Sequence, residues 1–272
     1  GSVIYNFDDL RSLSFTVAEG YRAGGSYIRA APGEPAEQRE FDPEFLTNYE
    51  VAFRSFWPDY ELTVNANVFY SDWEDQQVSV PGPTGTLLDV DVFNAGSSRL
   101  YGLELEINKP LSRTLNLTFT LGLLDTEFRD FPFAIDSNGD PINPDDPTYA
   151  NLVGNAFNSA PETTAALTLA YNGSSGWFAS GNVSYASDQF SDVTNLELNK
   201  VGDYTLVNGR VGYDWQYLTV SAFVNNLFDE RFAGRQGISN VSNDTGTEQL
   251  NQQPFFVVND PRLYGVEVRF SY

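Results

Sequence analysis

The chain has 272 residues, of which 37 are acidic and 15 are basic, so its formal net charge is −22 and its mean hydropathy is −0.31. This acidity excludes a nucleic-acid-binding surface, which needs clustered basic residues, and a peripheral protein held on anionic lipid. The sequence has no cysteine, histidine or methionine. Disulfides, zinc fingers, thiol or histidine-triad catalysis and the usual haem ligands are therefore excluded.

The hydrophobic pattern of the chain is that of strands. No stretch approaches the roughly 18–20 consecutive apolar residues that a membrane helix needs, and residues 1–5 lack the basic start and apolar core of a secretory leader. Apolar and polar residues instead alternate with a period of two. A membrane β-barrel has this pattern because lipid-facing and lumen-facing side chains alternate along each strand.

The alternation predicts ten strands, near residues 12–21, 47–57, 60–71, 100–109, 114–124, 162–172, 177–186, 204–214, 217–227 and 263–272. Most of them are close to the roughly 9–11 residues that a tilted strand needs to cross a bilayer. Strands of soluble proteins usually have about 5–6 residues. A soluble β-sandwich is the alternative, and strand length argues against it.

The predicted connections alternate between long and short. The short ones are residues 57–60, 109–114, 172–176 and 214–216, and the long ones are 24–45, 72–99, 125–161, 187–202 and 229–262. Antiparallel neighbours then place all short turns at one end of the sheet and all long loops at the other. Outer-membrane barrels have this asymmetry, with short periplasmic turns and long extracellular loops. A soluble sandwich has no reason to sort its loops by length.

Charge follows the same division. The five long loops hold 25 acidic and 8 basic residues, which is 17 of the 22 net negative charges. The apolar rows of the last nine strands carry no charge, and the charged strand residues fall on the opposite face: Glu50, Arg54, Glu104, Glu106, Arg210, Glu267 and Arg269. The exception is Glu19, which is in phase with Phe15 and Val17 and is expected to lie above the hydrocarbon. The predicted fold class is all-β, a transmembrane antiparallel meander β-barrel.

Several segments resemble one family in this order and spacing. They are 15–25 (FTVAEGYRAGG), 41–44 (FDPE), 48–51 (NYEV), 69–77 (FYSDWEDQQ), 94–96 (NAG), 101–106 (YGLELE), 159–162 (SAPE), 225–230 (NNLFDE), 260–265 (DPRLYG) and the aromatic end Phe270-Ser271-Tyr272. Together they resemble the barrel of TonB-dependent outer-membrane receptors over nearly the whole chain. Independently of the family, Gly24 and Gly25 are expected to turn the strand end through positive φ.

The resemblance implies a fold, a location and a function. Receptors of this family have 22-stranded barrels with a plug domain inside, so residues 1–272 are expected to be one β-barrel domain, the C-terminal ten strands, without a plug. It implies a multi-pass protein of the bacterial outer membrane, in contact with lipid. The implied function is uptake of a scarce, bulky solute such as a siderophore or other metal chelate, powered by the TonB system through an N-terminal part. The alternative is a stand-alone small barrel with a structural or passive-pore role.

Candidate ligand-binding residues lie near the long loops. Arg22, Arg231 and Arg235 are candidates for holding an anionic chelate, and Tyr27 and Trp73 for aromatic contacts. A solvated surface is the alternative for all five. The negative loops would repel a bare anionic chelate. Either the arginines offset this charge locally, or the ligand is neutral or cationic.

Evidence for a metal site or for catalysis is weak. Asp136, Asn138 and Asp140 place oxygen ligands at alternate positions around Gly139, as at the start of a calcium loop, within the loop 125–161. The distal bidentate glutamate is missing, so a turn built on Asn-Gly is the alternative. No other cofactor is expected. No enzyme site is predicted either, because the Glu104 and Glu106 pair fits a polar lumen lining.

Overall fold

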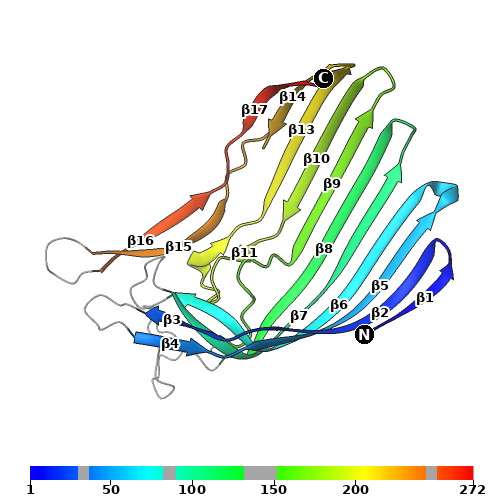
Figure 1. Ribbon diagram of the computed structural model, residues 1–272. Coiled ribbons are helices and arrows are strands. Elements are labelled where there is room, and N and C mark those ends of the chain that lie inside the picture. The colour runs from blue at the N-terminus through cyan, green and yellow to red at the C-terminus, as the bar shows by residue number, and fades with distance from the viewer. Residues whose placement is uncertain (30–36, 82–89, 132–151, 243–249, 272) are drawn as a thin grey trace.

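The computed structural model describes residues 1–29, 37–81, 90–131, 152–242 and 250–271. Its main sheet has eleven antiparallel strands, each paired with its neighbours in chain order. They are β1 (Ser2–Asp8), β2 (Arg11–Arg22), β5 (Glu44–Trp57), β6 (Leu62–Pro81), β7 (Val90–Pro110), β8 (Leu115–Asp130), β9 (Thr163–Asn172), β10 (Trp177–Ala186), β13 (Tyr204–Trp215), β14 (Leu218–Asn225) and β17 (Leu263–Phe270). Figure 1 shows a curved wall with β1 at one edge and β17 at the other.

The predicted meander is confirmed, but the predicted number of ten strands is wrong. The strand that the sequence analysis missed is β1, which pairs with β2 from Ser2 opposite Thr16 onward. It is only seven residues long, and Ile4 breaks the alternation set by Val3 and Tyr5, so its period-two signal is weak. Short turns gather at one end of the wall and long connections at the other, as predicted (Figure 1). These ends are called the turn end and the loop end below.

The long connections contain more strand than predicted. Three two-stranded hairpins extend from the loop end: β3 (Gly25–Arg29) with β4 (Glu37–Phe41), β11 (Gln189–Phe190) with β12 (Lys200–Val201), and β15 (Ala233–Ser242) with β16 (Leu250–Val258). β6 and β7 also run on beyond the predicted strand ends. A hairpin that stands away from the wall has no face buried on a core, so its sequence shows no regular apolar alternation.

Helices contribute little to the described part of the chain. Two 3-10 turns are present, η1 (Pro58–Tyr60) and η2 (Glu197–Asn199). In these described ranges, no helix has the length and apolar character needed to cross a membrane.

The strand register separates two faces of the wall. One row of directly paired residues runs across six strands and is entirely apolar: Val64, Ile107, Phe119, Leu167, Val183 and Val207. The row one residue away is entirely polar: Asn108, Thr118, Thr168, Asn182 and Asn208. Because one step along a strand reverses the face, the two rows define an apolar outer face and a polar inner face.

Side chains on the inner face bond to one another across the strands. Thr118 Oγ1 donates to Asn108 Oδ1 at 2.7 Å, and Asn182 Nδ2 donates to Thr168 Oγ1 at 2.9 Å. Asn208 Nδ2 lies 3.5 Å from Asn182 Oδ1, and the Asn208 oxygen also accepts the backbone N–H of Asn226 at 2.9 Å. These bonds link β7 to β8, and β9 to β10 and β13, and the second group reaches the start of the β14–β15 connection.

Glycines on the inner face make room for aromatic rings. Phe69, Phe178 and Phe223 each lie directly opposite a glycine of the neighbouring strand. A Cβ on Gly265 would come within 2.9 Å of Phe223 Cζ, and one on Gly212 would be 2.7 Å from Ser221 Cβ and closer still to the Phe178 ring. These positions need glycine for close approach and not for positive φ.

The assigned faces predict different costs for an introduced charge. In the full-length protein folded into lipid vesicles, Leu167→Arg should lower the free energy of unfolding by about 2–4 kcal/mol, because Leu167 is 39% exposed in the middle of the outer row. Thr120→Arg should cost much less, because Thr120 lines a polar hollow with Glu106 on the inner face. Urea titration of both variants measures the difference, and equal losses would refute the assigned faces.

Two glycines should respond to alanine with opposite signs. Gly212→Ala should destabilise the folded protein by about 1–3 kcal/mol, because its methyl group would overlap the Phe178 ring and Ser221. Gly181→Ala on the adjacent strand meets nothing within 4 Å. It should be neutral or stabilise by about 0.4–1 kcal/mol through the unfolded state. The same urea titration compares them, and a loss at Gly181 as large as at Gly212 would contradict the packing argument.

Candidate ligand-binding rim

The loop end of β2, β5, β6 and β7 is joined by one polar junction. The Arg22 guanidinium forms a bidentate ion pair with the Glu44 carboxylate, with Nε 2.9 Å from Oε1 and Nη2 3.1 Å from Oε2. The Glu44 side chain is only 7% exposed, and it also accepts the backbone N–H of Gln77 at 2.6 Å. Arg22 itself remains 59% exposed. The predicted ligand residue Arg22 is therefore already bound to a buried carboxylate.

Two amides extend this junction to the neighbouring loops. Gln77 Nε2 donates to the carbonyls of Ala23 and Asp42, both at 3.0 Å. Asn94 Nδ2 donates to the carbonyls of Asp42 at 2.9 Å and Asp75 at 2.7 Å, and Asn94 Oδ1 accepts the Asp42 N–H at 2.8 Å. Glu44, Gln77 and Asn94 each lie in a segment that resembles the family, but the sequence analysis did not name them as candidate site residues. A polar residue in a loop carries no sign of which backbone group it will bind.

The prediction that Gly24 and Gly25 turn the chain through positive φ is wrong. Neither glycine has positive φ. Gly24 lies against the backbone of Phe41 and Asp42, and a Cβ on Gly25 would be 2.8 Å from the Phe41 ring. Close approach of β3 and β4 is the reason for glycine at these positions. In the same hairpin, the Tyr27 hydroxyl accepts the backbone N–H of Val92 at 3.2 Å, so this predicted ligand residue joins the β3–β4 hairpin to β7.

An apolar cluster lies at the loop end, formed by residues of β6, β7 and β8 and of the β8–β9 and β11–β12 connections. Its buried members are Val78, Ala95, Phe128, Phe131, Leu152 and Val193, with Phe157 packed against them. Trp73 meets Phe157 edge to face, with ring centroids 6.2 Å apart. The Trp73 indole N–H is buried and has no hydrogen-bond partner among the described residues. The predicted ligand residue Trp73 thus stands at the margin of a small core.

Asparagine side chains lock two of these connections together. Asn195 bonds both backbone groups of Ala156, accepting its N–H at 2.7 Å and donating to its carbonyl at 3.0 Å. Asn155 Nδ2 donates in return to the Val193 carbonyl at 2.9 Å. Asn195 has φ +51°, a left-handed conformation that asparagine tolerates better than most residues. The β8–β9 and β11–β12 connections are therefore tied together.

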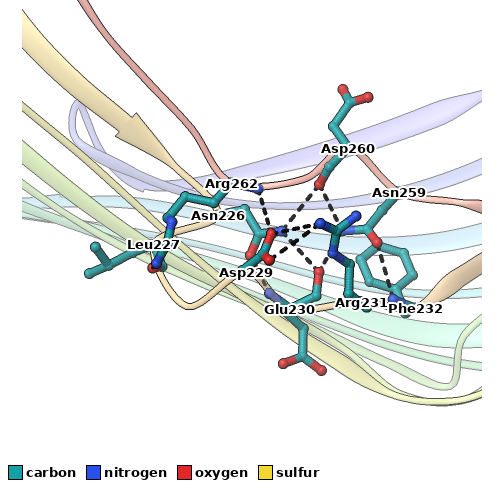
Figure 2. A network of polar contacts seen from close by, with 9 residues as sticks. All are labelled: Asn226, Leu227, Asp229, Glu230, Arg231, Phe232, Asn259, Asp260 and Arg262. Carbon is teal, nitrogen blue, oxygen red and sulfur yellow. Dashed lines mark hydrogen bonds and ion pairs between the residues drawn. The ribbon is translucent and has the colours of Figure 1, made fainter.

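A second asparagine clamp closes the loop end of β14 and β17 (Figure 2). Asn226 is 5% exposed with φ +52°. Its Nδ2 donates to the carbonyls of Glu230 at 2.9 Å and Asp260 at 3.2 Å, and its Oδ1 accepts the Glu230 N–H at 2.7 Å. Asn259 Nδ2 shares the same two carbonyls, at 2.9 and 3.2 Å. The Asn226 side chain thus holds the backbone of the loop.

The predicted ligand residue Arg231 belongs to this clamp. Arg231 Nη2 lies 3.1 Å from Asp229 Oδ1, and the Arg262 N–H donates to the same carboxylate at 2.8 Å (Figure 2). The pKa of the Asp229 carboxyl is lowered from its usual value. The hydrogen bond from the backbone N–H of Arg262 has the largest effect, and the bond from the Arg231 guanidinium has a smaller one. The stabilisation they give is present at neutral pH and is lost only as the pH falls through that lowered pKa. Beside β11, Lys200 likewise lowers the pKa of Asp188.

The other predicted site residues lie partly or wholly outside the described part of the chain. Arg235 lies in β15, paired with Val257, but its side chain is outside the described part of the chain. Asp136, Asn138 and Asp140 also lie outside the described residues, so the calcium site stays a prediction. Among the residues that the structure describes, no group of three acidic side chains is arranged to hold a metal ion.

Below the loop end, the inner face carries a polar hollow of about 390 Å³. Glu50, Arg54, Glu104 and Glu106 line it together with Asn65 and Asn67. Glu106 accepts Asn108 Nδ2 at 2.6 Å, whereas Glu104 has only a 3.4 Å contact with Asn67. The predicted inner location of these charges is confirmed. In the described part of the chain, none of the four forms an ion pair within 4.0 Å.

Comparison with known proteins gives a consistent result. A family model described as "TonB dependent receptor-like, beta-barrel" matches residues 1–227. The ferric yersiniabactin uptake receptor FyuA from Yersinia pestis is similar in structure, with a TM-score of 0.72 at 21% identity, over 100% of this chain and 36% of that receptor. The siderophore receptor PiuA from Acinetobacter baumannii gives 0.73 at 18% identity, over 100% and 35%.

The copper transporter OprC gives a TM-score of 0.68 at 16% identity, over 100% of this chain and 40% of that protein. At these identities the likeness concerns the fold alone. The chain spans roughly two fifths or less of the length of the three proteins, as the covered shares of 36%, 35% and 40% show.

Substitutions at Asn226 should separate its bonds from its backbone conformation. Asn226→Gly removes the side-chain bonds but keeps φ +52° accessible. The Glu230 amide should then exchange its hydrogen about tenfold to a hundredfold faster, since each buried bond left unmade costs about 1–3 kcal/mol. Asn226→Ala should exchange faster still, because the left-handed conformation costs a residue with a Cβ about 1–2 kcal/mol. Unchanged exchange in both variants would show that the clamp does not hold the loop.

Proposed function

The chain belongs to the TonB-dependent receptor β-barrel family, and from that membership we propose that it forms the C-terminal part of the barrel wall of a receptor that imports a scarce, bulky solute, such as a siderophore or another metal chelate. Members of this family are outer-membrane β-barrel proteins that act as receptors and transporters, not as enzymes. The solute, its binding residues and the coupling to TonB are parts of the proposal.

The observation that carries the proposal is the combination of the family match with a wall built for transport. The outer face has an uncharged apolar band suited to lipid, and the inner face is a polar surface with a hollow of about 390 Å³. A structured rim at the loop end holds polar and aromatic side chains near the entrance. A purely structural barrel would not need long, organised loops, whereas long loops are usually functional. The lipid-facing wall and these loops together support uptake through the barrel.

We propose a plug domain as the second component. Glu50, Glu104 and Glu106 face the inner hollow with Arg54 as the one cation lining it, and none of the four forms an ion pair within the described part of the chain. Carboxylates at a partly closed surface are stabilised when a cationic partner approaches. A plug inside the barrel would supply such a partner, and it would also supply the gate and the connection to TonB.

The alternative function is a stand-alone small barrel with a passive pore. Among the described strands, β1 and β17 are edges of the sheet without a further partner, which argues against it, because each unpaired backbone group in hydrocarbon costs several kcal/mol. In the proposed receptor, other strands of the same barrel would pair with both edges.

Uptake measurements distinguish the two functions. The full-length receptor, produced in a Gram-negative strain without iron receptors of its own, should take up radioactive iron from at least one member of a panel of ferric chelates. Uptake should saturate and should disappear when TonB is removed. The 272-residue chain alone, reconstituted in liposomes, should give at most a nonspecific leak. TonB-independent uptake by the full-length protein, or energised and specific uptake by this chain alone, would contradict the proposal.

A further inference from the structure

Aromatic side chains mark two levels on the outer face of the wall. Toward the loop end, Tyr49, Tyr70 and Tyr101 are directly paired across β5, β6 and β7. At the turn end, Trp57 is the last residue of β5 and Trp177 is the first residue of β10. Each of the five lies an even number of residues from the outer row or from a direct partner of that row, so all point to the outer face. Tyrosine and tryptophan are enriched where hydrocarbon meets water, because an apolar ring carries a polar tip.

The two levels are separated by the same length of strand in different parts of the wall. Outward residues eight positions apart mark them: Tyr49 and Trp57 on β5, Tyr101 and Lys109 on β7, Leu115 and Leu123 on β8, and Trp177 and Tyr185 on β10. On β8 the outward residues between these limits are uncharged, and the next one toward the loop end is Asp125. Eight residues of strand are about 26 Å long.

The register shows how far the strands are tilted between these levels. One row of directly paired outward residues starts at the turn-end level on β7 and ends at the loop end of β17: Lys109, Leu117, Leu169, Gly181, Gly209, Val224 and Tyr264. Its middle member, Gly181, is also midway between Trp177 and Tyr185 on its own strand. A row that crosses eight residues of strand in six steps of about 4.8 Å corresponds to a tilt of about 40°. The band between the levels is therefore about 20 Å high.

Beyond the tyrosine level, the outer face stops being apolar although the wall continues. The next row of paired outward residues is Glu19, Thr47, Asp72, Arg99 and Glu127. Arg99 and Glu127 form an ion pair at 2.6 Å within this row. β6 nevertheless runs on to Pro81, and β7 already begins at Val90, which is eleven residues past the tyrosine level on each strand. The apolar band thus occupies only the turn-end part of these strands.

We propose that the outer face fits a hydrocarbon layer only about 20 Å thick, bounded by the two aromatic levels and placed off-centre against the turn-end part of the wall. The partner is thus a bilayer much thinner than the typical hydrocarbon core of about 30 Å. Within the band, the large outward side chains stay exposed in the described structure, among them Val51, Val68, Leu169, Val183 and Val211. Lipid is the occupant that covers them, and the loop-end parts of β6, β7 and β8 project from the membrane into water.

Spin labels along one strand measure where the bilayer lies. This chain has no cysteine, so single cysteines can be placed in a full-length receptor freed of other cysteines and folded into phospholipid vesicles. The outward series on β8 is Leu115→Cys, Leu117→Cys, Phe119→Cys, Leu121→Cys, Leu123→Cys and Asp125→Cys. Each thiol carries a nitroxide, whose collisions with oxygen, which prefers lipid, and with a neutral nickel complex, which prefers water, are compared by electron paramagnetic resonance. Ser174→Cys, exposed in the turn between β9 and β10, gives the reference ratio in water.

The ratio of oxygen to nickel collisions should be highest at Phe119→Cys, midway between Leu115 and Leu123, and should fall to the water value at Asp125→Cys. Thr120→Cys, one residue away on the inner face, is the matched control and should not give a lipid-like ratio, because Thr120 lines the polar hollow. A bilayer centred on β8, which runs to Asp130, would instead place the maximum near Leu123. A maximum at any outward position other than Phe119→Cys, or a lipid-like ratio at Asp125→Cys, would overturn the proposed position.

Vesicles of different thickness test the proposed height of the band. The urea concentration that unfolds half of the receptor should be higher in dilauroyl than in dioleoyl phosphatidylcholine, because the shorter chains bring the hydrocarbon closer to about 20 Å and reduce the mismatch. Equal midpoints, or a higher midpoint in the dioleoyl lipid, would overturn the proposed thickness. Neither measurement involves solute uptake, so the fit to the bilayer and the proposed function can fail independently of each other.

Discussion

The constraint on which this structure depends is the pairing of backbone groups where water is absent. In hydrocarbon, an unpaired N–H or C=O costs several kcal/mol, so each strand must be paired on both sides. The unbroken registers of β9 with β10 and of β10 with β13 meet this demand, residue by residue. Once register is fixed, the faces are fixed as well, because a slip of one residue would turn Leu167 inward and Asn182 outward. Lipid face, polar inner face and the separation of turns from loops all follow from this pairing.

The parts of the fold that the sequence predicted are those that the bilayer imposes. Strands β5 to β10 were located because the outer row needs uncharged apolar side chains and the inner row does not, which writes a period of two into the sequence. β1 was not predicted, because it has only seven residues and Ile4 places an apolar side chain on the inner face, so its alternation of apolar and polar residues is weak. The strands of the hairpins β3–β4 and β15–β16 were not predicted, because nothing above the membrane requires one of their faces to be apolar.

The rim was less predictable for a different physical reason. Its order comes from side-chain amides that bind backbone groups distant in sequence, such as Gln77 to Ala23 and Asn195 to Ala156. A hydrogen bond of this kind depends on where two loops meet, and no local pattern records it. Sequence reasoning found Arg22 and Arg231 as candidate ligand residues because it could see their charge, but not that Glu44 and Asp229 already hold them.

These internal bonds bear on how the rim could recognise anything. Loops without structure must lose conformational entropy when they close on a ligand, and that loss weakens binding. Here the amide clamps around Asn94, Asn195 and Asn226 and the buried Phe128 cluster have already ordered much of the loop end. They do so with neutral side chains and with carboxylates that face cations inside the protein. Order in the described part of the rim is thus set by bonds within the protein itself, made before any solute arrives.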